Sequence, residues 1–206
     1  MTWRFVPLIG LSLFYGAGFA WRTWLHVRRY GGTGIVLFRS GRRTQDLREA
    51  LFLLVALVLF AEAVLAAVAP SGLRLLRPFP DDVAAPLRPL GALVLAGGTG
   101  LMVSAQLDLG ASWRIGIDEG ARPGLVTRGL YRFSRNPIFA AMILALLGFT
   151  LLLPNVLSLA VLVLGSLAIR RHVQDEEAYL TRTYGADYRA YAERVGRFVP
   201  AVGRLR

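Results

Sequence analysis

Two polar groups of residues interrupt the apolar second half of the chain, and both could bind a charged ligand. The first is the basic turn 129–137, with the sequence Gly-Leu-Tyr-Arg-Phe-Ser-Arg-Asn-Pro. The second is the acidic pair Glu176-Glu177, which follows an apolar hairpin over 138–169. Arginine, tyrosine and asparagine are costly where a chain re-enters a bilayer, unless a function needs them there. We therefore predict that the turn and the acidic pair form two halves of one ligand site.

The composition favours a membrane protein. Of the 206 residues, 55% are hydrophobic, and the absence of cysteine excludes disulfides and cysteine-based zinc sites. The 24 basic residues are all arginines and give a net charge of +11, but they alternate with long apolar runs. This pattern is typical of membrane proteins with basic loops rather than of nucleic-acid-binding proteins. We expect the bilayer, and no nucleic acid, as a partner.

The apolar runs predict an all-α fold, a polytopic membrane bundle of about five transmembrane helices. An amphipathic helical tail follows from residue 170 and is expected on the cytoplasmic side. The last two apolar runs are shorter than the roughly 20 residues that a helix needs to cross a bilayer alone, so they either extend into flanking residues or form a tilted hairpin. The five predicted helices cover residues 5–25, 50–69, 87–109, 138–153 and 156–169.

The arginines also predict the orientation. The segments 26–49, 110–136 and 170–206 together hold 19 arginines, whereas the opposite side holds four. Cytoplasmic loops carry the excess of arginine and lysine. We therefore expect the N-terminus outside and the candidate site facing the cytoplasm. The arginine-only composition is typical of a GC-rich genome, so we expect an integral protein of a bacterial inner membrane.

Two local signals concern helix ends. Asn136-Pro137 is typical of a helix start, with asparagine as the cap and proline in the first turn. In the tail, Gly185 predicts a helix stop and Asp187 the start of a second short helix, on which Tyr188 and Tyr191 share a face. The tail is therefore expected to lie under the membrane surface and to fold back on the bundle.

The motifs of the second half follow a specific order. They are Leu125-Val126-Thr127 with Gly129 and Tyr131-Arg132, then Arg135-Asn136-Pro137, an apolar hairpin, Glu176-Glu177 with Leu180, Tyr184-Gly185 with Tyr188 and Tyr191, and Arg197-Phe198 with Pro200. This order resembles the isoprenylcysteine carboxyl methyltransferase family and the related phospholipid methyltransferases. The resemblance covers about the last hundred residues.

The resemblance implies a small helical membrane bundle that binds S-adenosyl-L-methionine at its cytoplasmic face. It implies one domain over 1–206, with variable N-terminal spans over 1–109 and a cofactor-binding catalytic core over 110–206. The positions that match the family's motifs, or adjoin them, are expected to bind the cofactor: Pro123, Gly124, Leu125, Val126, Tyr131, Arg135, Asn136, Pro137, Ile138, Phe139, Glu176 and Glu177.

The same resemblance points to a lipophilic acceptor, either a prenylated thiol-acid, a phospholipid amine or another isoprenoid. His172 falls where prenylcysteine enzymes place a basic residue that orients the substrate carboxylate. Those enzymes usually have histidine where Asn136 stands and tyrosine where Phe139 stands, so the chain departs from the prenylcysteine pattern at these two positions. An amine acceptor would need a general base, and His172 is the candidate. Trp113 and Arg114 are expected to shape the acceptor pocket, and these three residues are the predicted catalytic set.

Other interpretations remain open. A membrane reductase of sterol or polyprenol type, with a nicotinamide cofactor, has a similar C-terminal half, and a non-catalytic membrane subunit of the same fold is also possible. Glu176-Glu177 could be a solvated helix face, and Tyr131 an interfacial anchor. Glu62 is a carboxylate within a predicted span, which makes it either a functional residue or the partner of an arginine at a helix end.

Overall fold

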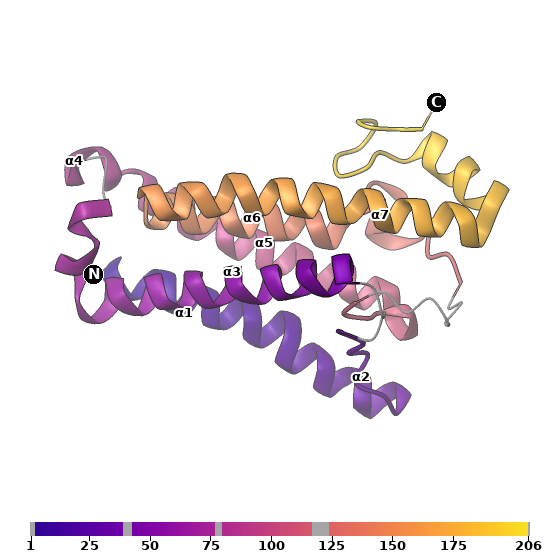
Figure 1. Cartoon of the computed structure of the whole chain (residues 1–206), viewed down its shortest axis with the longest axis horizontal. Helices are drawn as coiled ribbons and strands as arrows, with labels where there is room; N and C mark the ends of the chain where they lie inside the picture. Colours follow the sequence, from indigo (N-terminus) through magenta and orange to yellow (C-terminus); the bar gives the residue numbers. More distant parts are fainter. Residues whose placement is uncertain (1–2, 39–42, 77–79, 117–123, 206) are drawn as a thin grey trace.

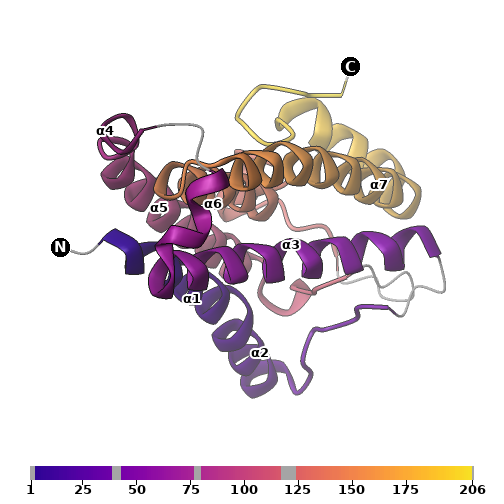
Figure 2. The ribbon, with the colours of Figure 1, turned by 60° about the vertical axis from the view of Figure 1, so that its left-hand side comes forward.

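The computed structural model describes residues 3–38, 43–76, 80–116 and 124–205. Every named element in these ranges is helical, so the predicted all-α class is confirmed. Figures 1 and 2 show an elongated bundle whose main helices run roughly along its long axis. The principal helices are α1 (Val6–Tyr15), α2 (Arg22–Tyr30), α3 (Arg43–Val68), α4 (Asp81–Ala84), α5 (Leu87–Leu109), α6 (Pro137–Leu152) and α7 (Val156–Arg194).

Four helical stretches in the described chain are long and apolar enough to cross a membrane. The first joins α1 to α2 through the π-helical segment Gly16–Trp21, and the whole stretch covers Trp3–Tyr30. The other three are Arg43–Val68, Leu87–Ser112 and Val156–Arg194. The fourth predicted span, 138–153, corresponds to a shorter apolar helix, α6, of 16 residues. The expected bundle is thus found, with four full-length candidates and one short helix packed among them.

The last predicted helix was placed too short, because α7 continues for 39 residues to Arg194. Its polar second half keeps helical backbone geometry until Gly185, where φ is 55° and the chain bends. The predicted break at Gly185 is therefore confirmed. Figure 1 shows that the chain returns from this bend toward the bundle.

Small residues bring α5 and α6 close together. A Cβ atom added to Gly91 would lie 2.7 Å from the backbone nitrogen of Leu152 and 2.8 Å from the Gly148 carbonyl oxygen. Gly98 has a similar contact, 3.1 Å from the Ala141 carbonyl oxygen. Such residues allow two helix backbones to approach in a membrane. This contact fixes the start of α6, and with it the basic turn, against the end of α5.

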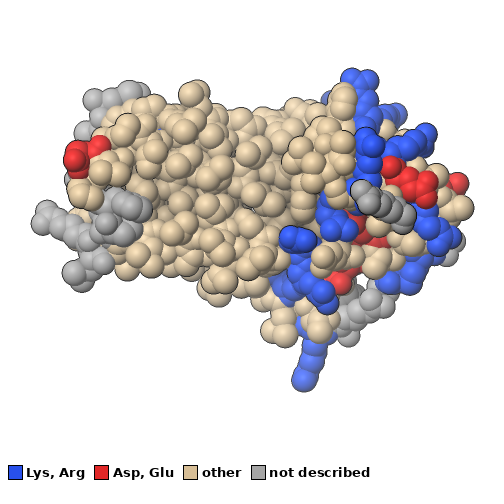
Figure 3. Space-filling model, turned by 90° about the horizontal axis from the view of Figure 1, so that it is seen from above, with Lys and Arg blue, Asp and Glu red and all other residues tan. Residues whose placement is uncertain are grey.

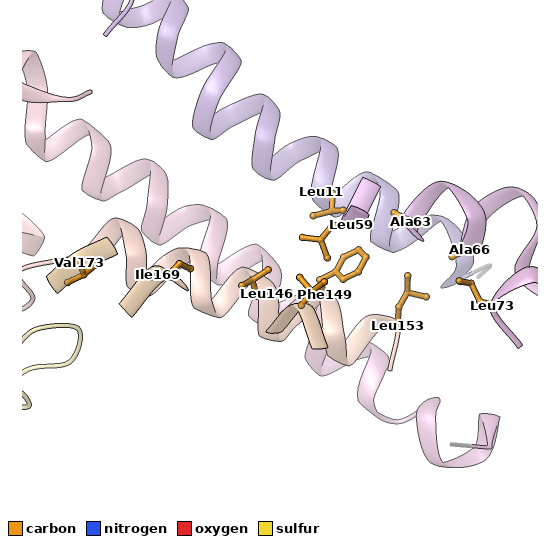
Figure 4. Packing of buried hydrophobic residues seen from close by; sticks show 11 residues of the cluster. Leu11, Leu59, Ala63, Ala66, Leu73, Leu146, Phe149, Leu153, Ile169 and Val173 are labelled. Atoms are coloured by element: carbon orange, nitrogen blue, oxygen red, sulfur yellow. The ribbon is translucent and has the colours of Figure 1, made fainter. Parts of the chain in front are cut away.

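The core lies between α1, α3, α6 and α7. In Figure 4, Leu11 and Leu59 approach Phe149, while Ile169 and Val173 lie farther along α7. At the far end of the bundle, the side chain of Asn155 caps α7 by accepting hydrogen bonds from the backbone N–H groups of Leu157 (2.9 Å) and Ser158 (3.0 Å).

Glu62 also lies at this far end and is buried. Its Oε1 accepts a hydrogen bond from the Asn155 side-chain amide, and the alternative of an arginine partner is not found among the described side chains. The amide was not foreseen because Asn155 is 93 residues away along the chain. Glu62 therefore ties α3 to the tip of the α6–α7 hairpin.

Charged side chains gather at the opposite end of the molecule. Figure 3 shows the basic atoms and most of the acidic atoms there and a small acidic group at the other end, while most of the elongated body is uncharged. The basic turn and the second half of α7 both belong to this end. The folded chain thus has the apolar body and charged end expected of a protein that spans a bilayer.

Candidate functional site

The basic turn begins against the last helical turn of α5. Gly129 has a positive φ of 60° and lies so close to the carboxylate of Asp108 that a side chain there would clash with it. The N–H group of Leu130 donates a hydrogen bond to Asp108 Oδ2 (2.7 Å). A short 3₁₀ turn, Gly129–Arg132, then buries Tyr131. Glycine is thus required here by both its backbone conformation and the space.

Arg135 is the buried centre of the turn, with its side chain 1% exposed. Its guanidinium donates to Glu177 Oε1 through Nε (3.0 Å) and Nη2 (2.9 Å). It also donates to the carbonyl oxygens of Ala192 (2.9 Å), Val195 (2.6 Å) and Gly203 (3.0 Å). With its donors turned to protein acceptors, Arg135 supports the site from behind rather than facing a ligand.

Glu177 is the acceptor at the centre of this hydrogen-bond network. Its Oε2 pairs with the guanidinium of Arg197 (2.8 Å to Nη2), and its Oε1 accepts from Asn136 Nδ2 (3.0 Å). The side chain is 7% exposed, which excludes a solvated helix face for this residue. A buried carboxylate is costly unless it is paired, so burial of Glu177 depends on its ion pairs with both guanidinium groups.

Asn136 precedes α6, with Pro137 in the first turn as predicted, but the expected side-chain cap is wrong. The Asn136 amide donates to Glu177 and to the Arg197 carbonyl oxygen (3.2 Å) instead. Both acceptors come from distant parts of the chain, and they draw the side chain away from the first N–H groups of the helix. Asn136 is therefore a link between the turn, α7 and the C-terminal tail.

The C-terminal tail completes this part of the site, which the motif order alone did not show. The N–H group of Arg135 donates to the Gly196 carbonyl oxygen (2.9 Å), and that of Asn136 donates to the Arg197 carbonyl oxygen (3.1 Å). The hydroxyl of Tyr191 donates to the carbonyl oxygen of Tyr131 (2.6 Å). Hydrogen bonds thus join the basic turn to the C-terminal tail. The Arg197-Phe198 motif was the sequence feature that could have indicated this contact.

Glu176 differs from its neighbour. It is partly exposed, and no ion pair of its side chain is seen among the described residues. Burial of the carboxyl, together with the charge of Glu177, raises the pKa of Glu176 to about 7. Burial and the nearby Glu176 also raise the pKa of the Tyr131 hydroxyl well above its usual value, so that tyrosine stays protonated. A carboxylate without a cation beside a buried tyrosine is suited to a cationic ligand.

His172 lies between two phenylalanine rings, with ring-centre distances of 5.5 Å to Phe52 and 5.3 Å to Phe139. Burial, and secondarily the charge of Arg48, lower the pKa of His172 to about 4, so the imidazole is neutral near pH 7. Its Nδ1 is buried without a hydrogen-bond partner in the described structure. His172 therefore offers a neutral polar atom, and no positive charge, between apolar walls.

Phe52 also lines an apolar pocket inside the bundle. Four helices contribute to its walls, so it runs into the part of the protein that a bilayer would surround. The lining residues are Leu11, Phe14, Tyr15, Leu51, Phe52, Val55, Leu59, Met142, Ala145, Leu146, Gly165, Ala168 and Ile169.

Trp113 lies in different surroundings from His172. Its ring is buried under the guanidinium of Arg22, at 4.6 Å, and packs at 5.5 Å from the His26 ring. Arg22 in turn donates to the carbonyl oxygens of Gln106 (3.2 Å) and Gly110 (2.8 Å). Trp113 thus joins the first span to the loop after α5, a role of Arg22 that no sequence pattern indicated.

The remaining predicted residues fall into three groups. Pro123 lies outside the described residues. Gly124 is exposed with a φ of 89°, while Arg114, Leu125 and Val126 are partly buried, and Leu125 packs against the tyrosines of the tail. Pro137 is buried, and Ile138 and Phe139 pack partly buried against the core.

Comparison with known families supports the resemblance seen in the motifs. Residues 87–187 match the family model for phospholipid methyltransferases, from the start of α5 to just beyond the bend in α7. This segment, just under half of the chain, is similar to that family. It contains the basic turn, His172 and both glutamates, and the activity of the family is methyl transfer to a lipid-type substrate. A search of curated proteins finds no match.

Proposed function

We propose that the protein transfers a methyl group from S-adenosyl-L-methionine to a lipophilic acceptor that enters from the bilayer. The observation that carries this proposal is Glu176, a partly exposed carboxylate without an ion-pair partner in the described structure, within a segment of a methyltransferase family. Its neighbour Glu177 is fully used by Arg135 and Arg197. Only one of the two acids is therefore free to bind a cation.

The residues present fit such a cofactor. S-Adenosyl-L-methionine carries a sulfonium, an ammonium and a carboxylate, and when bound it supplies an electrophilic methyl group. Glu176 would hold a cationic group or the ribose hydroxyls, while the buried Tyr131 and the partly buried Phe139 offer aromatic faces. Arg135, Asn136 and Glu177 would fix the turn that carries these groups. Such fixed positioning is a main source of acceleration for a displacement reaction.

The pocket and His172 support a lipid acceptor. A hydrocarbon chain in the apolar pocket would pass Phe52, which contacts the imidazole of His172. The neutral imidazole can accept a hydrogen bond or a proton from an acceptor, but it cannot attract a carboxylate by charge. This favours an acceptor with an N–H or O–H group, such as a phospholipid amine, over a prenylcysteine carboxylate.

A calorimetric titration of the purified protein tests the cofactor. Wild type should bind S-adenosylhomocysteine and not NADPH, and Glu176→Gln should weaken that binding at least about tenfold, since hydrogen bonds to charged groups contribute roughly 1.5–3 kcal/mol. Glu193→Gln, at an exposed position of the same helix, is the matched control. Binding of NADPH instead would identify a reductase, and binding of neither compound would favour a non-catalytic subunit.

The arginine distribution further supports a site on the cytoplasmic side. A reporter fused after Arg206 should be active only in the cytoplasm, and one inserted into 70–86 only outside. The reverse result would place the site away from a soluble cofactor.

A further inference from the structure

The C-terminal loop has a fixed shape and an exposed apolar end. The N–H group of Arg197 donates to the Val202 carbonyl oxygen (2.8 Å), and the N–H group of Val202 donates to the Val199 carbonyl oxygen (3.1 Å). Arg135 holds the far side of the loop through the Gly203 carbonyl oxygen (3.0 Å). The loop is thus closed on itself and anchored to the buried network of the site.

Four consecutive apolar residues, Val199–Val202, form the end of this loop and are all exposed; we name them the apolar tip. Val199 is 56% exposed and Val202 is 64% exposed. A loop that only had to close the chain could carry polar residues at such positions, and runs of exposed apolar residues usually mark an interaction surface. The rigid loop therefore presents hydrophobic groups rather than hiding them.

Positive charges flank the apolar tip. Arg204 follows it and is exposed, and Arg197 precedes it with its side chain 24% exposed. On the turn to which the loop is hydrogen-bonded, exposed Arg132 lies 4.5 Å over the exposed ring of Phe133. Apolar side chains beside arginines match the boundary between lipid head groups and acyl chains, where anionic head groups meet hydrocarbon.

The direction of the chain also suits such a partner. After the bend at Gly185, the chain turns back, and the C-terminal loop lies beside α7 rather than beyond its charged end (Figure 1). The loop thus lies near the level at which α7 passes from apolar to charged residues. For a protein with apolar helices of spanning length, this level is that of the membrane surface.

We propose that the apolar tip inserts into the interfacial region of the same bilayer that the helices cross, with the exposed Arg204 and Arg132 on anionic lipid phosphates. Because Arg135 and Asn136 are hydrogen-bonded to the carbonyl oxygens of Gly203 and Arg197 in this loop, the membrane surface then supports one wall of the candidate site. The proposal concerns the attachment of the tail and does not depend on the reaction catalysed.

The cysteine-free chain allows a direct test with an environment-sensitive fluorophore. Single cysteines are placed at Val199, Val202 or, as a control, at exposed Asp187 near the bend. Each variant is labelled with a nitrobenzoxadiazole probe and placed in nanodiscs with or without 30% phosphatidylglycerol. Lipids that carry a nitroxide near the head group should quench the labels at 199 and 202 at least twofold, and more strongly with phosphatidylglycerol present. The label at 187 should be unaffected.

Two results would overturn the proposal. Labels at 199 and 202 that are as exposed to water and as little quenched as the label at 187 would show a tip that remains in solution. Labels that are shielded from water but not quenched, together with a disulfide between two copies carrying Cys at 199, would show that a second copy covers the tip. Since these substitutions are at exposed positions, equal melting temperatures of the three variants and wild type confirm that each fold is intact.

Discussion

The two adjacent glutamates of α7 should respond in opposite ways to the same substitution. Glu177→Gln removes the charge that Arg135 and Arg197 share, and Glu176→Gln removes a charge with no ion-pair partner in the described structure. The two ion pairs of Glu177 lead us to expect that it matters more for stability than Glu176.

The magnitude follows from the buried network. In Glu177→Gln the guanidinium of Arg135, 1% exposed, loses its counter-charge, and removal of one partner of a buried ion pair costs roughly 3–5 kcal/mol. The glutamine oxygen still accepts one hydrogen bond, which places the loss near 3 kcal/mol. A chain of this length changes its melting temperature by about 2–4 °C per kcal/mol. We therefore expect a decrease of roughly 6–12 °C.

The assay is thermal unfolding of the detergent-solubilised variants, followed by a thiol-independent probe such as tryptophan fluorescence. Glu176→Gln should melt at or slightly above the wild-type temperature at pH 8, because the raised pKa of Glu176 means that its ionised form is disfavoured in the folded protein. A Glu177→Gln protein within 2 °C of wild type, or an equal decrease for Glu176→Gln, would refute the assignment of roles.

The remaining predictions concern pH and two local contacts. Since the pKa of Glu176 is about 7, affinity for S-adenosylhomocysteine should be constant above pH 7 and fall by up to about tenfold per pH unit below it. In titrations at pH 5.5–8.5, Glu176→Gln should abolish this pH dependence. For stability the sign is opposite: the folded protein keeps a proton between about pH 4.5 and 7 that the unfolded chain releases, so this carboxyl destabilises the fold as pH rises through that window. Asn136→Asp should lower the melting temperature more than Asn136→Ser, because aspartate adds a negative charge beside Glu177. Asn136→His keeps an N–H donor and should lower it least. Equal effects of the Asp and His substitutions would restore the capping model. Gly148→Leu should prevent correct packing of α5 on α6, seen as aggregation in size-exclusion chromatography, whereas Gly97→Leu, with open space at its Cα, should behave like wild type.

The class of fold and most helix positions could be predicted from the amino-acid sequence. Long apolar runs have one satisfactory state in a bilayer, the helix, because backbone polar groups must be paired internally. The third predicted helix, 87–109, agrees with α5 at both ends. The order of motifs was likewise readable along the chain, and it led to the family that residues 87–187 match. Helix length in the tail was not readable, because polar helix formers after residue 170 resemble a new amphipathic element.

The different roles of the site residues follow from long-range contacts in the folded chain. Glu176 and Glu177 are equivalent in sequence, yet one meets Arg135 and Arg197 and the other does not, since these partners lie 42 and 20 residues away. Asn136 has the local pattern of a helix cap, but Glu177 and the tail offer stronger acceptors for its amide. The close approach of Gly91 and Gly148, and the contact of Arg22 with Trp113, join segments that no local pattern relates. The sequence thus determines which polar groups the chain carries, while long-range packing determines which of them are paired within the fold and which remain available to a ligand.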